Sequence, residues 1–188
     1  MNMRKFVAIL GMLSFCVLTL PQIARCQEAG KPPTWQPDEA RSKRLAAAAK
    51  FEGWSIRPLS GYENRTKKDA RETRTTWVKQ DQGAMSVIQA LNPADKITLE
   101  QGLDRVVELM KQRWRNVELT PYERGVIDGK TFVRTRYSAE GLPGVAGRGF
   151  GFVYATYDAK TPFVITGFGT EKTIEDVEAS ALTFRILP

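Results

Sequence analysis

The chain has 188 residues, two cysteines and no histidine, and its 28 lysine and arginine residues outnumber 21 aspartate and glutamate residues to give a net charge of +7. The absence of histidine excludes histidine-based acid–base catalysis and histidine-ligated metal centres. A modest positive charge is ordinary for an exported soluble protein and does not indicate nucleic-acid binding, and the length suits a single domain with its own hydrophobic core.

The N-terminus has the pattern of an export signal. Arg4 and Lys5 precede an apolar run at Phe6–Leu20, and a polar stretch then leads to Cys26. As a helix the run would extend about 22 Å, which is shorter than the roughly 30 Å of bilayer hydrocarbon, so it predicts no membrane span. We expect residues 1–26 to be a signal peptide, cleaved near Cys26 or a few residues later, and the protein to reach the periplasm or the extracellular space.

Cleavage there would remove Cys16 and Cys26 together with three basic residues, so the net charge would fall to +4 and the mature fold would contain no disulfide. Lipidation of Cys26 is the alternative fate, and it would tether the protein to the envelope. Bacterial lipoprotein signals usually have leucine three residues before the cysteine and a small residue directly before it, whereas Ile23 and Arg25 occupy those positions here. The sequence therefore favours a soluble product.

The first predicted elements follow a polar, proline-rich segment, residues 27–37, which we interpret as a flexible linker. Residues 38–188 are predicted to form one domain with its core at about 51–187. Asp38 is a helix N-cap followed by acidic and then basic residues, which predicts a helix over 38–49. The alternation of apolar and polar residues from 51 to 59 predicts a strand, and the runs 73–79 and 84–91 predict a hairpin that Asn92 and Pro93 end.

The strongest helix signal lies at Leu99–Trp114. Thr98 and Gln101 have the spacing of a capping box, and apolar residues recur every three or four positions along one broad face. Such a helix is expected to cover a sheet. Further strands are predicted at 117–124, 130–137, 150–157 and 163–169, with a tight turn at Asp128-Gly129, and a closing helix is predicted after Thr173.

A glycine-rich segment, Gly141–Gly149, invites comparison with a phosphate-binding loop. A phosphate loop follows a strand and opens a helix, but here a strand is predicted to come next. We therefore interpret the segment as a mobile connection between strands, with a ligand-gating loop as the alternative.

Enzymatic chemistry finds no support in the remaining motifs. The sequence has no Gly-x-Ser-x-Gly elbow and no Asp-x-Asp-x-Asp calcium spacing, and its carboxylates fall in turns or on solvated helix faces. We expect no catalytic residues, no cofactor and no metal. The candidate binding residues are Lys130, Arg134 and Arg136 on one face of a strand, joined by Arg148, as a patch for an acidic partner or anionic lipid head groups. The alternative is a solvated sheet edge that discourages aggregation.

The order of elements resembles that of the PsbP-like superfamily, which includes the Ran-binding Mog-type proteins and small exported bacterial domains. The resemblance is carried by Phe51-Glu52-Gly53-Trp54-Ser55-Ile56-Arg57-Pro58 at the start and by Ala179–Phe184 at the end. It implies an α+β fold in which an antiparallel sheet is sandwiched between helices (α/β/α). It also implies a non-catalytic binding or assembly role, and no functional residue can be carried over.

Together these observations predict a secreted or periplasmic binding domain that acts on a protein or an envelope component through its sheet rim and glycine-rich loop. The alternative is a small-ligand carrier, or a histidine-independent hydrolase, with a pocket between the long helix and the sheet. An apolar cavity lined by Trp114 and sheet aromatics would favour that alternative.

Overall fold

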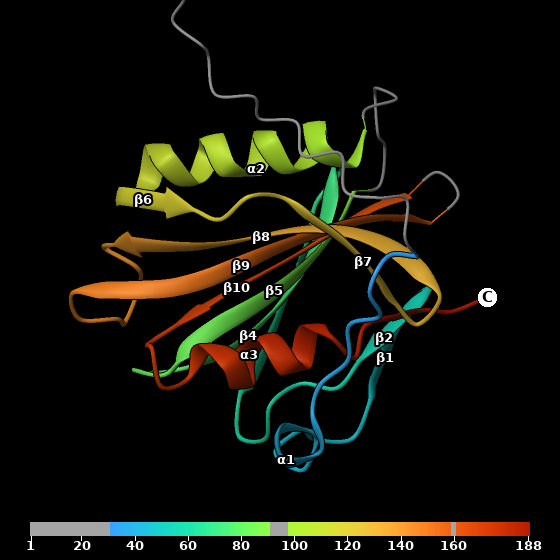
Figure 1. Cartoon of the computed structure of the whole chain (residues 1–188). Coiled ribbons are helices and arrows are strands. Elements are labelled where there is room, and N and C mark those ends of the chain that lie inside the picture. Colours follow the sequence, from blue (N-terminus) through green and yellow to red (C-terminus); the bar gives the residue numbers. More distant parts are fainter. Residues whose placement is uncertain (1–30, 91–97, 159–160) are drawn as a thin grey trace, which may run out of the picture. The chain divides into compact units, whose positions relative to one another are not determined.

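An antiparallel sheet of eight strands is the largest element in the part of the chain that the structure describes (Figure 1). The structure is a computed structural model and describes residues 31–90, 98–158 and 161–188. Seven strands lie side by side in the order β3 (Glu63–Lys68), β4 (Glu72–Lys79), β5 (Gly83–Ala90), β10 (Thr161–Gly169), β9 (Arg148–Asp158), β8 (Lys130–Glu140) and β6 (Arg115–Leu119). The eighth strand, β7 (Glu123–Ile127), also pairs with β8. The α+β class expected from the sequence is confirmed.

Two turns fix the register of the hairpins. Asp128 and Gly129 have φ angles of 48° and 78°, and this left-handed pair joins Ile127 directly to its partner Lys130. Between β4 and β5, Lys79 pairs with Gly83, and Asp81 takes a φ of 60°. Both hairpins lie where the sequence predicts them.

Helix α2 (Leu99–Arg113) packs over β6, β8 and β9. The Thr98 hydroxyl accepts a hydrogen bond from the Gln101 N–H at 3.2 Å, and the Gln101 side chain accepts one from the Thr98 N–H at 2.9 Å, so the predicted capping box is present. The helix buries three side chains against this face of the sheet, namely Leu103, Val107 and Met110.

Helix α3 (Ile174–Ala181) lies on the face of the sheet opposite α2 (Figure 1). Because successive strand residues point to opposite faces, adjacent residues of one strand join different cores. Phe132 of β8 joins the core that contains α3, whereas Val133 joins the core under α2. The core on the α3 side also takes in a small sheet of β1 (Ala49–Phe51), β2 (Trp54–Ile56) and β11 (Arg185–Ile186).

The helix predicted over 38–49 is reduced to one turn, α1 (Glu39–Ser42). The Arg57 guanidinium donates hydrogen bonds to the backbone carbonyls of Ser42, Leu45 and Ala46. Those carbonyls are therefore satisfied by a distant side chain instead of a continuing helix, and the buried Leu45 is held in the core. Tertiary contacts thus override the helix propensity of the alanine run.

Two predicted single strands are each divided in two. Gly53 takes a φ of 78° and turns the segment 51–59 into the β1–β2 hairpin, in which Phe51 stacks on Trp54 with ring centroids 4.2 Å apart. The segment 117–124 is divided around Pro121 into β6 and β7. Strand β3 was not predicted, because all six of its side chains are exposed and it has no apolar alternation.

The predicted linker, 27–37, is described from residue 31 and is not free of contacts. The Trp35 N–H donates to the Val126 carbonyl at 2.8 Å, and the Val126 N–H donates to the Pro33 carbonyl at 2.9 Å. The indole of Trp35 packs edge-on against Tyr154, with ring centroids 5.6 Å apart. Pro33–Trp35 therefore belong to the compact unit formed by residues 32–188.

Two sequence predictions fall outside the described residues, namely the signal peptide 1–26 and the sheet-ending Asn92-Pro93. Within the described ranges, no helix has the length and apolar character needed to cross a membrane.

Candidate functional site: the groove between helix α2 and the sheet

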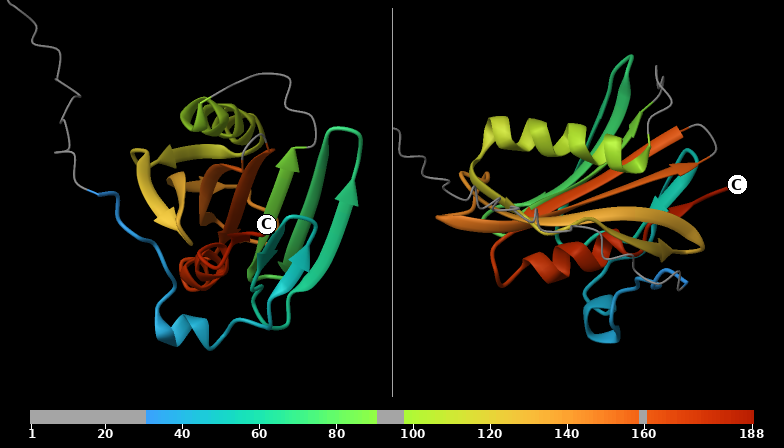
Figure 2. Two further views of the ribbon diagram at one scale, coloured as in Figure 1. Left: turned by 90° about the vertical axis from the view of Figure 1, so that its right-hand side faces the viewer. Right: turned by 45° about the horizontal axis from the view of Figure 1, so that its top comes forward.

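A groove of about 660 Å³ lies between α2 and the neighbouring half of the sheet. Figure 2 shows that α2 covers one part of the sheet only, and that β3, β4 and β5 lie beside the helix instead of beneath it. The wall formed by α2 and the residue that follows it includes Leu99, Gly102, Val106, Leu109, Arg113 and Trp114. The floor includes Ala84, Ser86, Ile88, Val164, Thr166 and Phe168. This volume falls within the usual range of small-molecule sites.

The groove exists because small side chains line its floor. Alternate residues of β5 face it, and three of them, Ala84, Ser86 and Ala90, are small. The intervening residues Met85 and Val87 fill the core on the α3 side. The sheet is therefore densely packed on one face and leaves room on the other.

The exposed surface of the groove is mainly apolar. Leu109 has 57% of its surface exposed, which is the largest value among the exposed large hydrophobic residues described. Trp114 stacks on Tyr137 with ring centroids 5.5 Å apart and meets Phe168 at 6.3 Å. Large apolar side chains left accessible along a concave surface are typical of a binding site.

Cationic groups border this apolar surface. Arg74, Arg105 and Arg113 line the groove, whereas Glu72 is the one acidic residue among the described lining. Arg74 Nη2 donates to Glu72 Oε1 at 2.8 Å. Burial raises the pKa of the nearby Tyr157 hydroxyl, and the positive charge of Arg105 opposes that rise in part.

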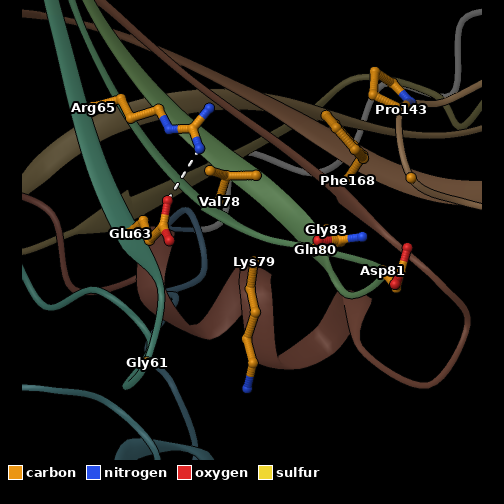
Figure 3. A pocket seen from close by; sticks show the side chains of 11 residues that line it. Gly61, Glu63, Arg65, Val78, Lys79, Gln80, Asp81, Gly83, Pro143 and Phe168 are labelled. Atoms are coloured by element: carbon orange, nitrogen blue, oxygen red, sulfur yellow. Dashed lines mark hydrogen bonds and ion pairs between the residues drawn. The ribbon is translucent and has the colours of Figure 1, made fainter.

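A second, more polar pocket of about 530 Å³ adjoins the groove, and Pro143 and Phe168 line both (Figure 3). Glu63 and Arg65 form an ion pair at 3.0 Å across its wall, and Lys79 extends away from that pair (Figure 3). Together the two hollows make a continuous lining from α2 to the β4–β5 turn.

The glycine-rich segment is the connection between β8 and β9, as the sequence predicts. Its Leu142 and Val145 are buried in the core under α2, and Gly141, Gly144 and Gly147 take φ angles of 84°, 70° and 71°. Pro143, between these two buried residues, is the residue of this segment that borders both hollows.

The four cations predicted as a patch are divided along the sheet. Lys130 is exposed at one end of β8, and Arg148 reaches Ser138 near the other end, at 2.8 Å. Ser138 is eight residue steps along the strand from Lys130, which corresponds to about 26 Å. The structure therefore brings Arg134 and Arg136 together but places Lys130 and Arg148 apart. Arg148 also pairs with Glu118 at 2.5 Å.

Arg134 and Arg136 share one carboxylate, that of Glu178 on α3. Arg136 Nη2 lies 3.0 Å from Glu178 Oε2, and Arg134 Nη1 lies 3.6 Å from Oε1. The side chains of Arg134 and Glu178 are only 13% and 10% exposed. The Arg134 guanidinium also pairs with Glu123 at 2.6 Å and stacks over Trp35 at 4.1 Å.

Tyr154 completes this buried polar cluster. Its hydroxyl donates to Glu178 Oε1 at 2.6 Å and accepts from Arg134 Nη1 at 3.0 Å. Burial, reinforced by the Glu178 carboxylate, raises the pKa of the Tyr154 hydroxyl, so it stays protonated and can donate. Burial acts to lower the pKa of Arg134, but its contacts with Tyr154 and Glu123 outweigh burial and raise it.

Metal ligands are not grouped in the described ranges: no three acidic, histidine or cysteine side chains there are placed to hold a metal ion. The groove offers apolar contact, arginine donors, the Glu72 carboxylate, and hydroxyl-bearing side chains that include Ser86 and Thr166.

Comparison with solved structures finds a similar protein, the cyanobacterial PsbP (CyanoP) of Synechocystis sp. PCC 6803. The match covers 88% of this chain and 99% of that chain, with a TM-score of 0.52 and 17% sequence identity. No protein-family model matches the chain, and no curated protein matches its sequence.

The chain has a PsbP-like fold.

The PsbP-like part of the sequence-based expectation is thereby confirmed as a fold, and its Mog-type part stays a prediction. Two lining residues of the groove in this PsbP-like fold, Arg74 and Leu109, were not predicted as site residues from the sequence. A signal for Leu109 was present, because Leu99, Val106 and Leu109 form a second apolar stripe beside the buried one.

Proposed function

We propose that the protein is an exported, non-catalytic binding protein that holds an apolar ligand in the groove between α2 and the sheet. The observation that carries this proposal is the apolar lining, which includes Trp114 and sheet aromatics and leaves Leu109 exposed. An apolar cavity with this lining is the feature expected of a small-ligand carrier.

Binding of an acidic partner at the sheet rim is less well supported. Its two central cations, Arg134 and Arg136, are engaged by Glu178 and, for Arg134, also by Glu123. Arg134 is buried, and releasing it costs several kcal/mol, on the order of the 3–5 kcal/mol seen when buried pairs are broken, whereas Arg136 is half exposed and costs less to release. The groove requires no such rearrangement.

Catalysis is not part of the proposal. A hydroxyl nucleophile needs an adjacent base, but the Ser86 hydroxyl is hydrogen-bonded to the Thr76 hydroxyl at 2.9 Å. Glu72, the carboxylate at the groove, is bonded to Arg74. Export is supported by the N-terminal sequence pattern alone.

The groove can be tested with N-phenyl-1-naphthylamine, a neutral apolar probe whose fluorescence rises in apolar surroundings. We expect saturable binding to the purified protein. Leu109→Glu places a charge at the mouth of the groove and should weaken binding about tenfold, because burying a leucine side chain contributes about 1.5–3 kcal/mol.

The matched control is Gln112→Glu, which makes the same change of charge at an exposed position outside the groove lining. It should leave probe binding unchanged. Absence of saturable binding, or equal weakening by both variants, would count against the proposed function.

A further inference from the structure

Arg74 has a side-chain donor that no group in the described part of the chain satisfies. Its Nε is the one buried side-chain nitrogen or oxygen without a hydrogen-bond partner among the described residues, although Nη2 of the same guanidinium is bonded to Glu72. An unsatisfied buried donor costs about 1–3 kcal/mol, and more when it is charged. Nε itself is covered, but the Arg74 side chain as a whole is 43% exposed and lines the groove, so the rest of its guanidinium can donate to an acceptor on a ligand.

The surroundings of Arg74 favour an anion. Arg105 lies on the opposite wall, and its charge acts on Tyr157, which pairs with Pro162 on the adjoining strand. In the strand pairing, Arg74 of β4 lies opposite Ile88 of β5. Ile88 is two residues from Ala90, which marks the same end of the groove. Two arginines therefore stand at this end, and the one acidic side chain of the lining is already paired with Arg74.

The other end of the groove is lined by aromatic side chains, with Arg113, the last residue of α2, beside them. Trp114 and Phe168 meet there, near Pro143. From Ala90 to Ala84 the floor extends about 20 Å, at roughly 3.3 Å per strand residue. One acyl chain spans about 15 Å, half of the roughly 30 Å of bilayer hydrocarbon, so a single extended chain fits along this floor.

We propose that the groove binds a single-chain lipid with a carboxylate end, a long-chain fatty acid, whose carboxylate accepts from Arg74 and whose tail runs toward Trp114 and Phe168. This inference rests on the proposed function. A carboxylate matches the planar donors of a guanidinium, and one chain, not two, matches the volume of about 660 Å³.

The test is displacement of bound N-phenyl-1-naphthylamine by laurate and by its neutral analogue dodecanol. In the unaltered protein, laurate should displace the probe at about tenfold lower concentration than dodecanol, because a hydrogen bond to a charged group adds to apolar burial. Arg74→Gln should abolish that advantage while leaving probe and dodecanol binding intact. The control Arg185→Gln, on β11 and outside the groove lining, should change neither ligand.

The outcomes separate the two proposals. Equal displacement by laurate and dodecanol, or an advantage for laurate that survives Arg74→Gln, overturns the carboxylate assignment and leaves the groove as an apolar site. Probe binding that neither lipid displaces overturns the lipid class. Failure of the probe to bind overturns the proposed function itself.

Discussion

Single side chains decide which cations of this protein are available to a ligand. Arg134 and Arg74 are both strand arginines, but Arg134 has two carboxylates, a hydroxyl and an indole ring as partners. Arg74 has one carboxylate and an unsatisfied Nε. The sequence pattern singled out Arg134, and the contacts single out Arg74.

Replacing Glu178 tests the structural role of the buried cluster. Glu178→Gln removes the charge that faces Arg134 and Arg136, so it should lower the free energy of unfolding by about 2 kcal/mol, because the buried Arg134 loses one of its two carboxylate partners. Urea unfolding, compared at constant slope, measures the change.

Glu175→Gln is the matched control on the same helix, since Glu175 pairs with Arg41 but is mostly exposed. Its cost should be about 0.5 kcal/mol or less. If both variants lose equal stability, the cluster does not stabilise the fold as described.

The central element of the account is helix α2, which presents two adjacent apolar stripes. Leu103, Val107 and Met110 are buried against the sheet, whereas Val106 and Leu109 face the groove. The first stripe anchors the helix on the sheet, although Met110 also borders the groove, and the second is only partly buried, with Val106 packed in part against the same core.

Two neighbouring valines separate these roles. Val107 is 3% exposed, so Val107→Ala should lower the free energy of unfolding by about 2 kcal/mol and leave probe binding unchanged. Val106→Ala should cost less than about 1 kcal/mol but weaken probe binding about fivefold, since it removes apolar contact area from the groove. The reverse pattern in denaturant and fluorescence titrations would contradict the assignment of the two stripes.

Local sequence signals predicted the elements whose structure depends on nearby residues. The capping box at Thr98 and the Asp128-Gly129 turn are examples, because hydrogen bonds or backbone angles within a few residues determine them. The alanine run after Arg44 predicted a helix that does not form. Arg57, which follows the β1–β2 hairpin, donates hydrogen bonds to the backbone carbonyls of Leu45 and Ala46 instead. Propensity cannot report such a distant partner.

The groove was foreseen only as an alternative, for a similar reason. The spacing of apolar residues predicts its helix wall, but its floor joins the β4–β5 hairpin to β10, which lies far along the chain and meets β5 only in the folded sheet. The pairing of Arg136 with Glu178, 42 residues apart in sequence, likewise follows from the docking of α3 and not from any local pattern.

At the scale of the whole molecule, the exported carrier that we propose would have a fold that needs no disulfide. The compact unit begins at Pro32, close to the expected cleavage site, and its residues include no cysteine. Its stability must therefore come from the two cores on either side of the sheet.

The processed N-terminus provides a test at this scale. Expressed from its full sequence in a bacterial host, the protein should be recovered from the periplasmic fraction with its first residue at or shortly after Gln27. Intact-mass measurement reads this directly. A product that keeps residues 1–26, or that carries a lipid on Cys26, would contradict the soluble exported form.

The location of the ligand is the central claim, and amide chemical shifts measured during titration with N-phenyl-1-naphthylamine test it most directly. We predict that the largest changes occur at Val106 and Leu109 on α2 and at Ile88 and Val164 on the floor of the groove. Largest changes at Arg134, Arg136 and Glu178, on the opposite face of the sheet, would contradict the account.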